Sequence, residues 1–153
     1  MKEASTLLVA LLLSACAEST PRCSFTGEAI RAVSAGCLVR YEDTILLVEI
    51  PGAQFSPPGG SVDEGESAQC TAERETFEEA GVRVSAGDLA QTFDNGFYLF
   101  WCEPTGSRVV NIASPLEITS GGWYSAAEFN TFRWRFPGQQ RLIAKLLNEQ
   151  LED

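Results

Sequence analysis

The sequence predicts a mixed α/β domain, with strands before and after one helix and a second helix at the end of the chain. The chain has 153 residues, a length that fits one compact domain. Strand-like apolar segments flank a polar stretch with helical spacing at residues 67–80. This order gives a layered α/β arrangement and not a pure doubly wound sheet.

The first two strands are expected to form a hairpin. Small and β-branched residues occupy positions 32–41, Glu42 and Asp43 make a turn, and residues 44–48 are strongly apolar. Residues 51–60 then contain three prolines and three glycines, which predicts a loop with a constrained path.

A second hairpin is expected after the central helix. Residues 82–84 and 89–93 look extended, and the Asn-Gly pair at 95–96 is a strong tight-turn signal before the aromatic run 97–102. Residues 123–124 (Trp-Tyr) suggest a further short strand.

Both helices have recognisable boundaries. Gly81 suits the position just after the end of the central helix, and Pro137 opens the last helix. The apolar residues of the last helix form one stripe, which predicts core packing. They are Leu142, Ile143, Leu146, Leu147 and Leu151.

Composition excludes several kinds of function. The chain has 11 Lys and Arg against 21 Asp and Glu, and this charge of −10 argues against nucleic acid or a bare anionic membrane as a partner. It has no His, which excludes Ser/His/Asp and Cys/His catalysis and every His-ligated metal centre. Any chemistry must therefore use carboxylates, Lys, Ser, Thr, Tyr or Cys.

The first residues have the outline of a signal peptide. Lys2 precedes an apolar run at residues 7–13, and small residues follow it. The run is far below the roughly 20 residues that cross a bilayer. Leu13 to Cys16 resembles the lipobox of bacterial lipoproteins, in which the cysteine is lipidated and becomes the first mature residue. Ordinary cleavage, an uncleaved anchor and a chain that stays in the cytoplasm are the alternatives.

This signal divides the chain into three parts. Residues 1–15 are the expected signal peptide, 16–31 a short tether, and 32–153 the folded domain. The expected location is the periplasmic side of a bacterial cell envelope, with the lipid on Cys16 as the one membrane attachment.

The remaining cysteines predict disulfides. Cys23, Cys37, Cys70 and Cys102 are even in number and contain no C-x-x-C pair, so a zinc ribbon or a redox dithiol is not expected. In an oxidising compartment they can form up to two disulfides, with three possible pairings. Buried free thiols are the alternative.

Three glutamates are spaced to share one face of the central helix. Glu75, Glu78 and Glu79 fall within two turns of each other on one side. Like charges at this spacing repel, so a positive partner is expected, and Mg²⁺ or Mn²⁺ is the natural one for oxygen ligands. The alternative is a solvated acidic helix face, the usual meaning of a charge run.

A glycine loop and an arginine complete the pattern. Gly59 and Gly60 have no side chains, so their backbone groups can approach a metal or a phosphate closely. Arg74 lies one residue before the first of the three glutamates and is expected to flank the acidic face. It can reach back to Glu66 and fix the loop against the helix.

These residues resemble the Nudix box, a pattern of the form G-x5-E-x7-R-E-U-x-E-E-x-G-U in which U is a bulky apolar residue. Gly60 to Val82 matches it at every charged and glycine position. Thr76 departs from the first apolar position, a mild change that removes no ligand. The resemblance covers roughly residues 36–147.

The resemblance implies an α/β/α sandwich with a mixed β-sheet and hydrolysis of nucleoside diphosphates linked to another moiety. It further implies a divalent metal, Mg²⁺ or Mn²⁺, and a small-molecule diphosphate substrate. The implied metal ligands are Glu75, Glu78, Glu79 and the Gly60 carbonyl, with Glu66 and Arg74 ordering the site.

The proton acceptor and the substrate stay open. Family members place the base on the helix or on a later loop, and Glu103 and Glu117 are candidates here. If the base is absent, the chain is instead a nucleotide- or diphosphate-binding module with weak turnover or none. Aromatic residues 97–101 could stack on a nucleobase, although such residues more often belong to the core.

Overall fold

The computed structural model describes residues 19–150, so the expected signal peptide and Cys16 lie outside the described residues. Within that range, no helix is both long and apolar enough to span a membrane. The elements are, in chain order, β1 (Ser34–Tyr41), β2 (Thr44–Ile50), β3 (Gln54–Ser56), β4 (Gly59–Ser61), α1 (Ala68–Ala80), β5 (Val84–Thr92), β6 (Phe97–Pro104), β7 (Ser120–Ser125), the 3₁₀ helix η1 (Ala126–Thr131) and α2 (Gln139–Glu149).

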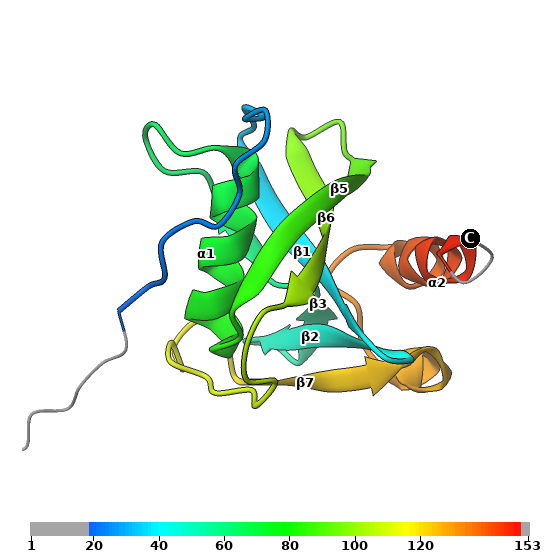
Figure 1. Ribbon diagram of the computed structural model, residues 1–153. Coiled ribbons are helices and arrows are strands. Elements are labelled where there is room, and N and C mark those ends of the chain that lie inside the picture. The colour runs from blue at the N-terminus through cyan, green and yellow to red at the C-terminus, as the bar shows by residue number, and fades with distance from the viewer. Residues whose placement is uncertain (1–18, 151–153) are drawn as a thin grey trace, which may run out of the picture.

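The architecture is an α/β/α sandwich, as the sequence and the family resemblance predict. One seven-stranded sheet has the order β3-β2-β1-β6-β5, with β4 paired to β1 and β7 to β2. Figure 1 shows α1 on one side of this sheet and α2 on the other. Side chains of β1 alternate between the layers, so that Cys37 and Val39 join the core under α1 and Leu38 joins the core under α2.

Both predicted hairpins are confirmed. β1 and β2 pair antiparallel across the turn at Glu42, and β5 and β6 pair antiparallel across the turn at Gly96, whose φ is 82°. β1 and β6 then pair parallel, from Ser34 with Phe97 onwards, which makes the sheet mixed. The parallel pair places the start of β1 beside the turn between β5 and β6.

The predicted loop at residues 51–60 is wrong in part, because it contains β3 and most of β4. β3 pairs with β2, and β4 pairs with β1. Strands of three residues are too short to show an alternating pattern. Pro57 and Pro58 lie between the two strands, where the ladder needs no N–H from them.

Of the expected extended segments 82–84 and 89–93, Val84 and residues 89–92 belong to one strand, β5, whereas residues 82 and 83 precede it. Its pairing with β6 has register irregularities between Ala86 and Leu89 and again between Leu89 and Gln91. These irregularities explain why the sequence suggests two pieces. The short strand expected around Trp123 is confirmed as β7.

Both helices begin and end close to the predicted positions. Ser67 caps α1 by accepting a hydrogen bond from the Cys70 N–H at 3.2 Å, and Gly81 ends it with a φ of 69°. α2 begins two residues after Pro137. Four residues of its apolar stripe pack in the core beneath it, namely Leu142, Ile143, Leu146 and Leu147. Leu151 lies outside the described residues.

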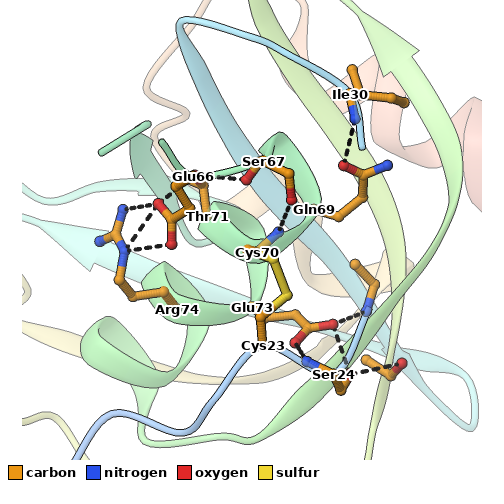
Figure 2. Close-up of a disulfide and its surroundings, with 12 residues drawn as sticks. Cys23, Ser24, Ile30, Glu66, Ser67, Gln69, Cys70, Thr71, Glu73 and Arg74 are labelled. Atoms are coloured by element: carbon orange, nitrogen blue, oxygen red, sulfur yellow. Dashed lines mark hydrogen bonds and ion pairs between the residues drawn. A yellow bond between two sulfur atoms is a disulfide. The ribbon is translucent and has the colours of Figure 1, made fainter. Parts of the chain in front are cut away.

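The four cysteines of the described chain form two disulfides, and the structure selects the pairing. Cys37 joins Cys102 inside the core, where their exposed fractions are 0% and 2%. Cys23 joins Cys70 and so ties the segment before β1 to α1 (Figure 2). The described part of the expected tether is therefore covalently attached to the domain.

Candidate active site

The acidic face of α1 is held in place by the packing of the opposite face. Ala68, Ala72 and Ala80 of α1 are fully buried against the sheet. Thr76, the departure from the family pattern, is also fully buried and donates a hydrogen bond to the Ala72 carbonyl at 2.7 Å. Its hydroxyl is thus satisfied within the helix, and the polar substitution leaves no unpaired group.

The glycine loop touches the acidic face directly. The Gly59 N–H donates a hydrogen bond to Glu79 Oε2 at 3.0 Å. A Cβ placed on Gly60 would lie 2.5 Å from Glu75 Cδ, so the carboxyl group occupies the space that any side chain at this position would need. Glu75 and Glu79 therefore face the loop, whereas the Glu78 side chain is 40% exposed.

Arg74 is the positive centre of the cluster. Its Nη1 donates to Glu75 Oε1 at 2.8 Å and to Glu78 Oε2 at 3.0 Å. Its Nη2 donates to Glu66 Oε2 at 3.0 Å and to the Ser61 carbonyl at 2.9 Å. The predicted contact with Glu66 is confirmed. The expectation that Arg74 only flanks the acidic face is wrong, because its long side chain also bridges two of the glutamates.

Burial and crowding raise two of the carboxyl pKa values. Burial raises the pKa of Glu79 to about 7, and the charges of Glu75 and Glu117 add to this while the Gly59 N–H opposes it. Burial also raises the pKa of Glu75, against the lowering effect of Arg74.

Glu66 behaves in the opposite way to these two glutamates. Burial favours its neutral form, but the hydrogen bonds from Arg74, Thr71 and the Asp63 N–H together outweigh it. Its pKa therefore lies below the ordinary value, so Glu66 stays charged and anchors Arg74.

The donor set fits a hard divalent cation. Carboxylate oxygens are the ligands that Mg²⁺ and Mn²⁺ prefer, and two of them already converge on one positive atom, Arg74 Nη1. Among residues 19–150, no three acidic or sulfur side chains are already arranged around one metal position. A cation would therefore have to compete with Arg74 for Glu75 and Glu78.

The two candidates for the proton acceptor lie in different places. The charge of Glu117 raises the pKa of both Glu75 and Glu79, so its field reaches the acidic face. Glu103 lies near the end of β6, opposite Ser85 of β5. Counted along β6, it is five residues beyond the position that is aligned, across β1, with Gly60 of β4. At about 3.3 Å per residue this is roughly 16 Å along the strand.

A cavity of about 650 Å³ opens beside the glycine loop. Three segments far apart in the sequence form its wall: β4, the turn between β5 and β6, and the start of α2 with the residues before it. Phe93 and Phe97 line one part, and Phe136 and Leu142 line another. Of the aromatic residues 97–101, Phe97 reaches this cavity, whereas Phe100 is buried in the core.

Arg135 is a site residue that the sequence does not reveal. It lines the cavity, and its positive charge lowers the pKa of Glu79, so its field reaches the acidic face. Its guanidinium carbon is 5.2 Å from the centre of the Phe136 ring. No local pattern marks this arginine, because only the fold brings it beside α1.

The fold and the acidic helix together define an α/β/α domain with a carboxylate-rich site for a cation. The sequence matches the family described as "NUDIX domain" over residues 30–146, which is most of the chain. The protein therefore belongs to the NUDIX family, and it is an enzyme of the Nudix hydrolase class.

Solved structures agree with this assignment. An ADP-ribose pyrophosphatase from Streptococcus suis 89-1591 has 22% identity and a TM-score of 0.64, covering 78% of this chain and 91% of that chain. A NUDIX family hydrolase from Clostridium perfringens has 17% identity and a TM-score of 0.66, covering 78% and 97%. A C. elegans Ap4A hydrolase has 18% identity and a TM-score of 0.62, covering 78% and 99%. At these identities the comparison establishes the shared fold.

Proposed function

We propose that this protein is a divalent-metal-dependent hydrolase of the pyrophosphate bond in a nucleoside diphosphate linked to another moiety. The observation that carries the proposal is the contact between the acidic face and the glycine loop, made by Glu75 with Gly60 and by Glu79 with Gly59. The adjoining cavity is large enough for a nucleoside-sized group. The solved structures that share the fold include a pyrophosphatase and an Ap4A hydrolase.

Glu75, Glu78, Glu79 and the Gly60 carbonyl would hold Mg²⁺ or Mn²⁺, with Arg74 and Glu66 keeping the carboxylates in place. When bound, the cation supplies positive charge that offsets the diphosphate and makes phosphorus more electrophilic. This charge matters in a protein of net charge −10, which otherwise repels an anionic substrate.

Water is the proposed nucleophile, and Glu117 is the proposed proton acceptor. The effect of its charge on the pKa values of Glu75 and Glu79 supports this role, whereas the position of Glu103 on β6 does not. Attack on phosphorus by water, with the proton passing to a carboxylate, breaks one phosphoanhydride bond and releases two phosphate-bearing products.

The test is a hydrolysis screen over nucleotide sugars, dinucleoside polyphosphates and nucleoside triphosphates, with Mg²⁺, with Mn²⁺ and with a chelator. Wild-type protein should release monophosphate products only with metal. Glu78→Gln should lose most of the rate while folding normally. Glu149→Gln is the matched control, because it removes one carboxylate charge from α2, where Glu149 pairs with Lys145.

In the same screen, Glu117→Gln should lower the rate far more than Glu103→Gln. A wild type that binds diphosphates but releases no product would favour the binding module.

We also propose that the chain is exported and lipid-anchored at Cys16. Two disulfides among the other cysteines support an oxidising compartment. Mass spectrometry of the mature N-terminus tests this proposal: a lipidated Cys16 is expected, and an intact Met1 would contradict it.

A further inference from the structure

The segment before β1 reaches the acidic face of α1. Thr20 Oγ1 donates a hydrogen bond to Glu78 Oε1 at 3.3 Å, across 58 positions of sequence. Arg74 Nη1 donates to the other oxygen, Oε2, at 3.0 Å. The two oxygens of this carboxylate are thus each held by a different donor.

Glu78 is the acidic residue for which an added donor matters most. Its side chain is 40% exposed, whereas those of Glu75 and Glu66 are 16% and 17% exposed. Neighbouring atoms restrain the two less exposed carboxylates, but Glu78 depends more on hydrogen bonds for its orientation.

A compact clamp holds the segment only a few residues after Thr20. Cys23 is bonded to Cys70 of α1. The next residue, Ser24, donates through its N–H to Glu73 Oε2 at 2.6 Å and through its hydroxyl to Glu73 Oε1 at 2.8 Å (Figure 2). Glu73 is 7% exposed and also accepts a hydrogen bond from the Ala86 N–H of β5 at 3.0 Å. The clamp therefore joins the segment, α1 and β5 at one point.

The two disulfides differ in access to solvent. Cys23 is exposed and Cys70 is partly exposed, whereas Cys37 and Cys102 are buried at 0% and 2%. A thiolate must reach a sulfur atom to exchange with a disulfide, so a reductant can attack the Cys23–Cys70 bond in the folded protein and not the core bond.

We propose that Thr20 is a positioning residue for Glu78, that the Cys23–Cys70 disulfide keeps it in place, and that reduction of this bond by a dithiol weakens the metal site. This inference rests on the proposed function, since it assigns a controlling element to the same site. In the reduction, the two sulfur atoms gain two electrons and two protons and become thiols, while the dithiol becomes a disulfide. Thr20 then loses its covalent attachment three residues away, and the segment stays attached to α1 through hydrogen bonds such as those from Ser24 to Glu73.

The first experiment isolates the hydroxyl of Thr20. Thr20→Val should weaken Mn²⁺ binding about fivefold, the effect of losing a hydrogen bond of roughly 1 kcal/mol. The electron paramagnetic resonance signal of Mn²⁺ measures this binding without any substrate. Thr20→Ser should restore wild-type affinity. Thr26→Val is the matched control, because it makes the same change at an exposed position beyond the clamp. Equal Mn²⁺ affinity in the valine variant and the wild type would overturn the role of Thr20.

The second experiment tests the disulfide in the full chain. After dithiothreitol treatment without denaturant, differential alkylation and peptide mass spectrometry should show labelled Cys23 and Cys70 and unlabelled Cys37 and Cys102. Mn²⁺ affinity should fall at least as far as in the Thr20→Val variant. A protein with both Cys23→Ser and Cys70→Ser should have this low affinity already and should not respond to the dithiol.

Unchanged Mn²⁺ affinity after reduction, with Cys23 and Cys70 labelled, would overturn control by the disulfide. The proposed function fails differently: a wild type that binds Mn²⁺ but hydrolyses no diphosphate refutes the enzyme while the affinity comparison still decides this inference. A wild type that binds no Mn²⁺ would overturn both.

Discussion

At the scale of the residue, the site depends on two positions where one kind of side chain is required. Gly60 must lack a Cβ, because the Glu75 carboxyl group lies where that atom would be. Arg74 must carry a fork of several N–H donors, because it bonds Glu66, Glu75 and Glu78 together with a carbonyl of the loop. The first requirement is steric and the second is electrostatic, so substitutions at the two positions should have different signatures.

Gly60→Ala should displace Glu75 and lower the hydrolysis rate at least tenfold, a loss of about 1.4 kcal/mol in transition-state stabilisation. The added methyl would lie 2.5 Å from Glu75 Cδ, so the carboxyl group or the loop has to move. Gly106→Ala is the control, because nothing lies within 4 Å of a Cβ there. The measurement is the rate at saturating metal. Equal rates for the two variants would show that Glu75 is not held by this contact.

Glu79 should make the metal-free protein less stable as the pH rises. Its pKa in the folded protein is about 7, above the ordinary 4.5, so the folded state binds the proton more tightly than the unfolded state does. The contribution of Glu79 to stability is therefore fully present below pH 4.5, declines as the pH rises from 4.5 to about 7, and is lost above that, by about 3 kcal/mol at most. Urea unfolding with a chelator, from pH 4.5 to 8, should show wild type losing stability relative to Glu79→Gln. If the free energy of unfolding changed with pH in the same way in wild type and Glu79→Gln, the raised pKa would be contradicted.

At the scale of the element, the sequence predicts the parts whose boundaries are marked by local chemistry. Gly81 and Gly96 mark the end of α1 and the turn before β6, and both adopt the positive φ that glycine favours. β3 and β4 carry no such marks, because each has three residues and gains its pairing from β2 or β1. Their positions are therefore set by tertiary contacts that the sequence does not display.

The Cys37–Cys102 disulfide should be a large contributor to stability, because it joins β1 to β6 in the centre of the sheet. It closes a loop with a sequence separation of 65, for which the chain-entropy model gives about 4 kcal/mol. Replacing both cysteines with alanine should lower the free energy of unfolding by an amount of this order, measured with urea. The Cys23→Ser and Cys70→Ser protein serves as the comparison, with a separation of 47. A loss below roughly 1 kcal/mol would show that packing around the strands compensates for the bond.

At the scale of the whole molecule, the site divides into a part that one continuous segment encodes and a part that the fold assembles. The acidic helix, the glycine loop and Arg74 lie within residues 60–82 apart from Gly59, so their spacing is visible in the sequence. The cavity draws on residues around positions 60, 95 and 137, which become neighbours only when β4, the β5–β6 turn and α2 meet. For this reason the metal-binding face can be predicted from the sequence, and the residues that would select the substrate cannot.

Substitution of Arg135 should show whether the cavity attracts an anionic substrate by direct contact or through the net charge of the protein. The molecule carries a net charge of −10, so any lost cation weakens the attraction of an anionic diphosphate slightly through the long-range field. Arg135 lines the cavity, where its guanidinium can also bond a phosphate directly. Arg135→Gln should therefore raise KM about tenfold, the effect of losing a hydrogen bond to a charged group worth roughly 1.5 kcal/mol.

Lys145→Gln is the control for this prediction. It changes the net charge equally, but Lys145 lies on an exposed part of α2, with its side chain 70% exposed. KM should respond weakly to that control, and the difference between the two variants should persist at high salt, where the long-range contribution is screened. Equal effects that both vanish in salt would mean that Arg135 acts through net charge and does not contact the substrate.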